Sequence, residues 1–212
     1  MKKSILFIFT ACFLFTTSCS DFLDEEHKTK YSSEYVFGTP EGLKLAVNAL
    51  YALQRYYAND TENATIFALE RGTDLAVTNG GTGNFYGIYD PNYLKPSASQ
   101  VGFMWRTMYQ IIGKANEIIA AAEDLEDTPS LRATVSEAKC FRAQSYFLLY
   151  RTFDRIWLNI QPTTAENVND PRDFHAASEK EVFDLIYEDL EYAITNLDWV
   201  SDEAGRFTQA AA

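Results

Sequence analysis

Apolar residues recur at steps of three and four along four stretches of the chain, which is the spacing of an amphipathic helix. The stretches cover residues 39–57, 100–125, 129–153 and 178–197. Three of them also carry a recognisable helix start, because Thr39 and Thr128 each precede a proline and Ser178 opens a Ser-x-x-Glu capping box. The pattern therefore predicts an all-α fold built on four long helices.

The stretch 129–153 is expected to be the packing centre of this fold. One of its faces is apolar apart from a single arginine and consists of Val135, Ala138, Arg142, Tyr146, Leu149 and Phe153. A guanidinium among apolar side chains is costly unless an acid or backbone carbonyls meet it. The fourth stretch offers four acids for this purpose, Asp184, Glu188, Asp189 and Glu191. Of these we favour Asp189 as the structural partner of Arg142.

The stretch 100–125 carries a seam of apolar residues at alternating steps of four and three. The seam consists of Val101, Trp105, Met108, Ile112, Ala115, Ile119 and Ala122. This spacing is close to a heptad, so the helix should pack along a neighbour at a shallow angle. The short joint that follows makes the second and third helices antiparallel neighbours. Asn116 lies beside the seam and is either a polar register pin or a surface residue.

Residues 58–99 interrupt the helical pattern with glycines, asparagines, threonines and four closely spaced aromatic residues. A long irregular segment in a compact domain is usually either functional or mobile. Saccharide binding needs aromatic faces beside amides or carboxylates, and this segment has both. The candidate ligand-binding residues are Asp74 and Asn84 as hydrogen-bonding groups and Tyr86 and Tyr89 as stacking faces. Alternatively, Asp74 caps a turn and the aromatic residues pack beneath the loop.

The first residues have the build of a signal peptide, with Lys2 and Lys3 before a short apolar run. Cys19 follows a small serine, which predicts a lipoprotein signal over residues 1–18 and acylation of the Cys19 thiol. Thr16 stands where an aliphatic residue is usual, so an ordinary secretory signal with a different cleavage site is the alternative. Residues 19–38 are then a polar tether that leads into a helical domain over residues 39–212.

Charge and motif content narrow the possible functions. The formal net charge is −12, which argues against binding to nucleic acid or to anionic lipid surfaces. His27 and His175 have no metal-ligand spacing around them, and the glycines at 80–83 lack the lysine of a phosphate-binding loop. Cys140 is expected to be a small buried residue. The sequence therefore indicates a protein that is not an enzyme, with no catalytic residues, no metal and no cofactor.

Five segments, taken in order, resemble the SusD/RagB-like lipoproteins. They are Cys19-Ser20-Asp21-Phe22-Leu23-Asp24, Trp105-x3-Tyr109-x2-Ile112-x2-Ala115-Asn116, Glu137-Ala138-Lys139-Cys140-Phe141-Arg142-Ala143, Asp189-Leu190-Glu191-x-Ala193, and Gly205-Arg206-x-Thr208. The resemblance implies tetratricopeptide-like helix pairs in an outer-membrane, outward-facing lipoprotein of Bacteroidota. It also implies a SusC-like TonB-dependent transporter as partner and a glycan or other nutrient oligomer as cargo. The region around the 72–93 loop would supply one part of the ligand platform.

The chain departs from that family pattern after the third helix. Asp154 stands where the family usually has glycine, and the expected Val-Pro-Leu-like turn is replaced by residues 157–162. Thr208 and the alanines that follow predict the start of a fifth helix, so we expect residues 39–212 to be an incomplete N-terminal domain. The alternative function is a helical-repeat scaffold lipoprotein that binds a protein partner through a groove. The ligand stays open among starch, another glycan and a peptide.

Overall fold

The computed structural model describes residues 31–59, 95, 97, 99–164, 166–171 and 174–212. All regular elements among these residues are helices. They are α2 (Ser33–Gly38), α3 (Pro40–Asn59), α5 (Ser99–Ala122), α6 (Pro129–Phe153) and α7 (Glu179–Asn196). Within this part of the chain, no helix combines the length and apolar character that a bilayer crossing requires. The predicted all-α class is therefore confirmed.

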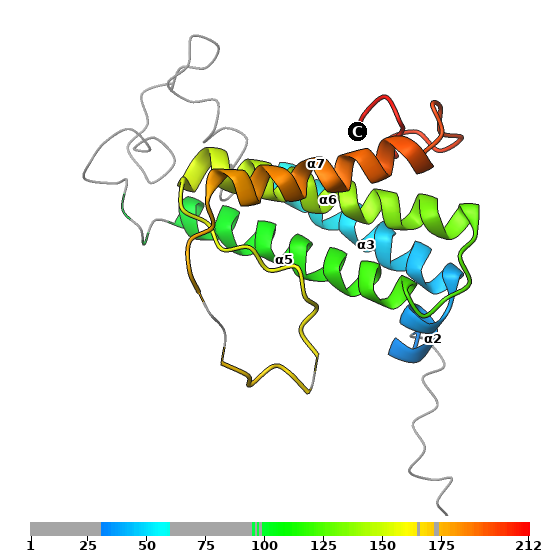
Figure 1. The fold of residues 1–212 in the computed structure, drawn as a ribbon, viewed down its shortest axis with the longest axis horizontal. Helices are drawn as coiled ribbons and strands as arrows, with labels where there is room; N and C mark the ends of the chain where they lie inside the picture. Colours follow the sequence, from blue (N-terminus) through cyan, green and yellow to red (C-terminus); the bar gives the residue numbers. More distant parts are fainter. Residues whose placement is uncertain (1–30, 60–94, 96, 98, 165, 172–173) are drawn as a thin grey trace, which may run out of the picture. The chain divides into compact units, whose positions relative to one another are not determined.

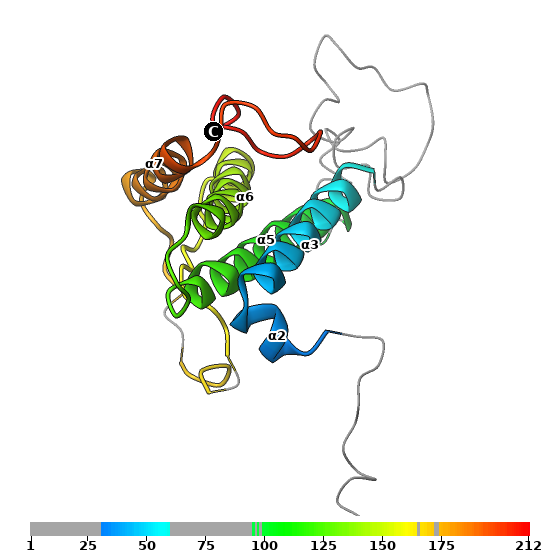
Figure 2. The ribbon, with the colours of Figure 1, turned by 90° about the vertical axis from the view of Figure 1, so that its right-hand side faces the viewer.

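The central position of α6 follows from its contacts, since it packs against α7, α5 and α3. Figures 1 and 2 show α6 between α7 and α5, with α3 lying along α5. Because α5, α6 and α7 are joined end to end by connections at alternate ends of the bundle, neighbouring helices run antiparallel. Most of the α6 surface is buried as a result, which explains why its buried residues occupy more than one face.

The helix starts follow the local chemistry of the sequence. The Thr128 hydroxyl accepts the Leu131 N–H at 3.2 Å, with Pro129 in the first turn of α6. At α7, Ser178 and Glu181 bond each other's backbone N–H groups and form the predicted capping box. Thr39 accepts the Gly42 N–H at 3.1 Å at the start of α3. These side chains satisfy N–H groups that have no partner within their own helix.

The apolar stripe predicted for α5 needs a correction at Trp105. That side chain keeps 36% of its surface exposed and lies at the edge of the core, against Phe153. Met108, Ile112 and Ala115 of the predicted seam are fully buried, and Met104, Ile111 and Ile118 complete the buried line of α5. The reason is that α5 contacts both α3 and α6. Its buried surface is therefore wider than the predicted seam and is not centred on it.

The segment before α3 also differs from expectation. Residues 33–38, which the sequence assigned to the tether, form the short helix α2 against α3 and α5. Gly42 permits this contact, because a Cβ atom there would lie 2.2 Å from the Tyr35 carbonyl oxygen. At the other end, residues 209–211 form a turn, in which the Thr208 carbonyl accepts the Ala211 N–H at 2.9 Å and the Ala212 N–H at 3.2 Å.

Candidate functional site

The predicted site residues fall into two groups. Cys19 and the four ligand-binding candidates lie outside the described residues, namely Asp74, Asn84, Tyr86 and Tyr89. The four residues with an expected structural role are all placed, and three of them meet in one buried cluster. Trp105 stands apart from that cluster, packed on Tyr109 and Phe153 at the edge of α5.

Arg142 on α6 meets Asp189 on α7 in a two-pronged ion pair. The Arg142 Nε donates to Asp189 Oδ2 at 2.7 Å and its Nη2 donates to Oδ1 at 2.8 Å. Lys139 Nζ adds a third bond to Oδ1 at 2.8 Å. The Asp189 side chain is fully buried, and charge-assisted bonds of this geometry are among the strongest in proteins. Asp189 is the acid that the sequence favoured, and the three alternatives on α7 are exposed.

Asn116 on α5 extends this pair toward the α6–α7 connection. Arg142 Nη1 donates to Asn116 Oδ1 at 2.8 Å, and Asn116 Nδ2 donates to the Asn159 carbonyl at 2.7 Å. Asn116 is only 1% exposed, so it is a buried link and not a surface residue. We call these connected residues the buried polar network. It consists of Asp189, Arg142, Lys139, Asn116 and Asn159.

Two tyrosines then hold residues 157–159 in place. The Tyr146 hydroxyl donates to the Asn159 carbonyl at 2.9 Å and accepts the Asn159 N–H at 2.8 Å. The Tyr109 hydroxyl does the same for Trp157, at 2.8 and 2.9 Å. Each hydroxyl therefore satisfies both backbone groups of one residue, as a neighbouring strand would. Sequence reasoning missed these two clamps, because the groups they bind are backbone atoms.

A second buried cluster lies on another side of α6, and the sequence analysis did not predict it. The Tyr51 hydroxyl on α3 donates to Glu137 Oε2 and accepts the Phe207 N–H at 2.7 Å. Arg206 lies over the Tyr51 ring, donates to Asn48 Oδ1 at 2.7 Å and has its Nε 3.5 Å from Glu137 Oε2. Burial raises the pKa of the Glu137 carboxyl, although Tyr51 and Arg206 oppose that shift. The sequence signal that could have pointed to this cluster is the Gly205-Arg206 pair, which belongs to one of the segments that resemble the family.

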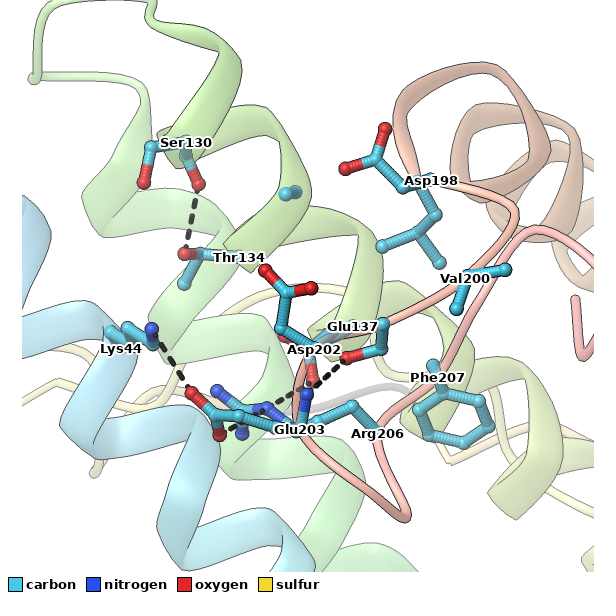
Figure 3. Close-up of a pocket in the computed structure, with 13 residues that line it drawn as sticks. Lys44, Ser130, Thr134, Glu137, Asp198, Val200, Asp202, Glu203, Arg206 and Phe207 are labelled. Atoms are coloured by element: carbon cyan, nitrogen blue, oxygen red, sulfur yellow. Dashed lines mark hydrogen bonds and ion pairs between the residues drawn. The ribbon is translucent and has the colours of Figure 1, made fainter.

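Figure 3 shows the polar pocket beside this second cluster. Its volume is about 240 Å³, and its walls come from α3, α6 and the segment after α7. Both of its cations are already engaged, because Lys44 Nζ lies 3.5 Å and Arg206 Nε lies 3.3 Å from Glu203 carboxylate oxygens. The pocket therefore joins the last segment of the chain to the helices, and its described lining residues offer no uncommitted cation to a ligand.

An apolar groove of about 410 Å³ lies between α6 and α7. Phe147 and Tyr187 line it and keep 39% and 58% of their surfaces exposed. Cys140 also lines the groove but is buried, and burial together with the neighbouring carboxylates raises the pKa of its thiol to about 12. The thiol therefore stays protonated near neutral pH and is a poor nucleophile. Among the described residues, no group of three or more potential ligand side chains is arranged to hold a metal.

The fold and its buried ion pairs define a protein of paired antiparallel helices around one central helix. A family model described as "Starch-binding associating with outer membrane" matches residues 21–212, so the chain belongs to the SusD-like family. A SusD-like protein of Bacteroides ovatus is 28% identical over all of this chain and 38% of its own length. One from Formosa agariphila is 28% identical over 96% of this chain and 40% of its own length.

Solved structures agree with this assignment. A laminarin-binding SusD-like protein superimposes with a TM-score of 0.67 at 27% identity, over 80% of this chain and 37% of its own. A surface glycan-binding protein from Bacteroides fluxus has a TM-score of 0.66 at 21% identity, over 82% of this chain and 38% of its own, and shows the fold alone. The chain thus spans about two fifths of the length of the relatives it matches.

Proposed function

We propose that the full-length protein is a non-enzymatic lipoprotein of the outer membrane that captures glycan at the cell surface. It then delivers the glycan to a SusC-like TonB-dependent transporter. The observation that carries this proposal is the family match, which covers residues 21–212 under the description of starch binding at the outer membrane. The laminarin-binding relative adds a solved example of glycan recognition on the same framework.

The proposed primary ligand site uses Asp74 and Asn84 as hydrogen-bonding groups and Tyr86 and Tyr89 as stacking faces. Aromatic rings stack on the C–H faces of sugars while amides and carboxylates bond their hydroxyls. The described part supports this use because α3 and α5, which flank residues 60–98 in sequence, are fixed against each other by a continuous apolar core. A loop that begins and ends on a rigid scaffold is a common arrangement for binding sites.

The test of this site is a glycan titration of the full-length protein by calorimetry. The double variant Tyr86→Ala/Tyr89→Ala should bind glycan at least about tenfold more weakly, since each stacking contact contributes roughly 1 kcal/mol. Tyr187→Ala is the matched control, because it removes an exposed tyrosine from α7. If both variants bind as the wild type does, the loop is not the ligand site.

Anchoring through Cys19 is a separate part of the proposal. The acyl chain would tether an acidic protein that a negatively charged bilayer surface otherwise repels. Mass spectrometry of the mature N-terminus should find lipid on Cys19, and Cys19→Ala should move the protein from the membrane fraction to the soluble fraction. An unmodified mature N-terminus at another residue would favour the ordinary secretory signal.

The apolar α6–α7 groove is the observation that favours the alternative, a helical-repeat scaffold that binds a protein partner. Helix-in-groove recognition uses apolar anchors of this kind. The two functions separate in one experiment, in which the wild type and a Phe147→Glu variant are tested for glycan affinity and for copurification with the transporter. The scaffold function would be established if the wild type binds no glycan but copurifies with its partner, and the Phe147→Glu variant no longer does.

A further inference from the structure

The connection between α6 and α7 encloses a cleft of about 400 Å³, apart from the polar pocket and the apolar groove. Its described lining combines one aromatic residue, three amides and one carboxylate with the apolar residues Leu158, Ile160, Pro162 and Pro171. The polar lining residues are Trp157, Asn159, Gln161, Asn167 and Asp170. This volume falls within the roughly 300–1,000 Å³ range of small-molecule sites.

The backbone of the first wall is fixed before any ligand arrives. Tyr109 and Tyr146 clamp residues 157 and 159 through both of their backbone polar groups. Asn116 adds a third bond to the Asn159 carbonyl and ties this wall to the buried polar network. A binding surface that is already ordered avoids most of the conformational cost of association.

The opposite wall is ordered by Asn167. Its Nδ2 donates to the Pro162 carbonyl at 3.0 Å, and its Oδ1 accepts the Thr164 N–H at 2.8 Å. The Asp170 N–H then donates to the Asn167 carbonyl at 3.1 Å and turns the chain back. The Asn167 side chain is therefore consumed in shaping the cleft and is not available to a ligand.

Three other polar side chains of the cleft have no intramolecular bond within the described part of the chain, those of Asn159, Gln161 and Asp170. Trp157 is half-buried and held by ring contacts with Tyr109 at 6.3 Å and Phe174 at 4.7 Å between ring centroids. Two free amides, a carboxylate and a supported indole form the set of groups that recognises a neutral polyol. The described residues of the lining include no cation.

We propose that the cleft formed by residues 157–162 and 167–171 is a second saccharide-contacting site, separate from the predicted loop at 72–93. This inference rests on the proposed glycan-binding function and adds a site to it. Gln161, Asp170 and Asn159 bond sugar hydroxyls, and Trp157 supplies an apolar edge. A polymer that reaches both places is held at two points, which raises retention beyond that of either site alone.

The experiment compares a double variant of the cleft with a single control variant, both in the full-length protein, by calorimetric titration with laminarin oligosaccharides and with xylogluco-oligosaccharides. Gln161→Ala/Asp170→Ala removes two exposed cleft groups that make no side-chain bond in the described structure. It should weaken binding by about fivefold or more, as expected when two ligand hydrogen bonds are lost. Asn169→Ala is the matched control, an exposed amide of the same connection that does not line the cleft, and it should leave the affinity unchanged.

Trp157→Phe gives an independent reading, because it keeps a ring against Tyr109 and removes the indole. If the cleft contacts sugar, the fluorescence change on adding oligosaccharide is reduced by this replacement. Equal affinities for Gln161→Ala/Asp170→Ala and Asn169→Ala, together with weakened binding by Tyr86→Ala/Tyr89→Ala, would overturn this inference and leave the proposed function standing. A wild type that binds neither oligosaccharide would overturn both. Thermal melts of every variant show whether a loss of affinity reflects unfolding.

Discussion

Asp189→Asn is the sharpest test of the central ion pair, because it removes one charge and almost no volume. In the wild type, Asp189 accepts three charge-assisted hydrogen bonds, two from Arg142 and one from Lys139. The Arg142 and Lys139 side chains are only 6% and 11% exposed, so the variant leaves two cations buried without an anion. Removing one partner of a buried pair typically costs about 3–5 kcal/mol, a large part of the 5–15 kcal/mol that stabilises a domain.

The assay is equilibrium urea denaturation followed by helical circular dichroism. Asp184→Asn is the matched control, because it makes the same change on the same helix at an exposed acid that forms an ion pair with Lys180. We expect Asp184→Asn to leave the transition unmoved, since exposed pairs contribute little. A double-mutant cycle with Arg142→Met should then give a coupling energy of about 2 kcal/mol between the two residues. Equal transitions for Asp189→Asn and Asp184→Asn would refute the argument that the buried network stabilises the fold.

Three further predictions concern single positions. Asp154 ends α6 at φ 61°, so Asp154→Gly should raise the free energy of unfolding by about 1 kcal/mol in the same denaturation assay, and a decrease would contradict this strain. Gly42→Ala should destabilise the protein because its Cβ would lie 2.2 Å from an α2 carbonyl oxygen, whereas Gly113→Ala, with nothing within 4 Å, should stabilise α5 slightly. Since the pKa of Glu137 is raised in the folded state, stability should fall as pH rises from the ordinary value of 4.5 through the folded pKa, and Glu137→Gln should flatten that part of the pH profile.

The long helices could be predicted from the sequence because their determinants are local. The starts of α6 and α7 depend on Thr128 and Ser178, which act within three residues of themselves. The short helix α2 escaped this reasoning, since six residues carry no apolar period and the helix is held by packing on α3. Trp105 was misplaced because a periodic seam indicates a face but not how wide that face becomes when two neighbours share it.

The polar sites also differ in whether the sequence could predict them. Arg142 could be paired with an acid of α7 from the sequence because a charged residue on an apolar face requires a partner, and Asp189 was the one favoured among four candidates. The Glu137 cluster could not be inferred in this way. Its members Tyr51 and Phe207 come from distant parts of the chain, and one of the bonded groups is a backbone N–H. The ligand candidates at 74–89 lie outside the described residues, so they stay predictions.

Two of the buried charged residues of α6, Glu137 and Arg142, explain why the central helix has one position and not several. An apolar helix with small residues can slide by a turn past its neighbours at modest cost, because one apolar contact replaces another. Arg142 fixes α6 to α7 and α5, while Glu137 fixes it to α3 and to the segment after α7. Because the residues are five apart, they project about 140° from each other around the helix. A shift that preserves one cluster must break the other, so we infer that the two clusters together set the register of the bundle and, through Asn116, the position of the α6–α7 connection.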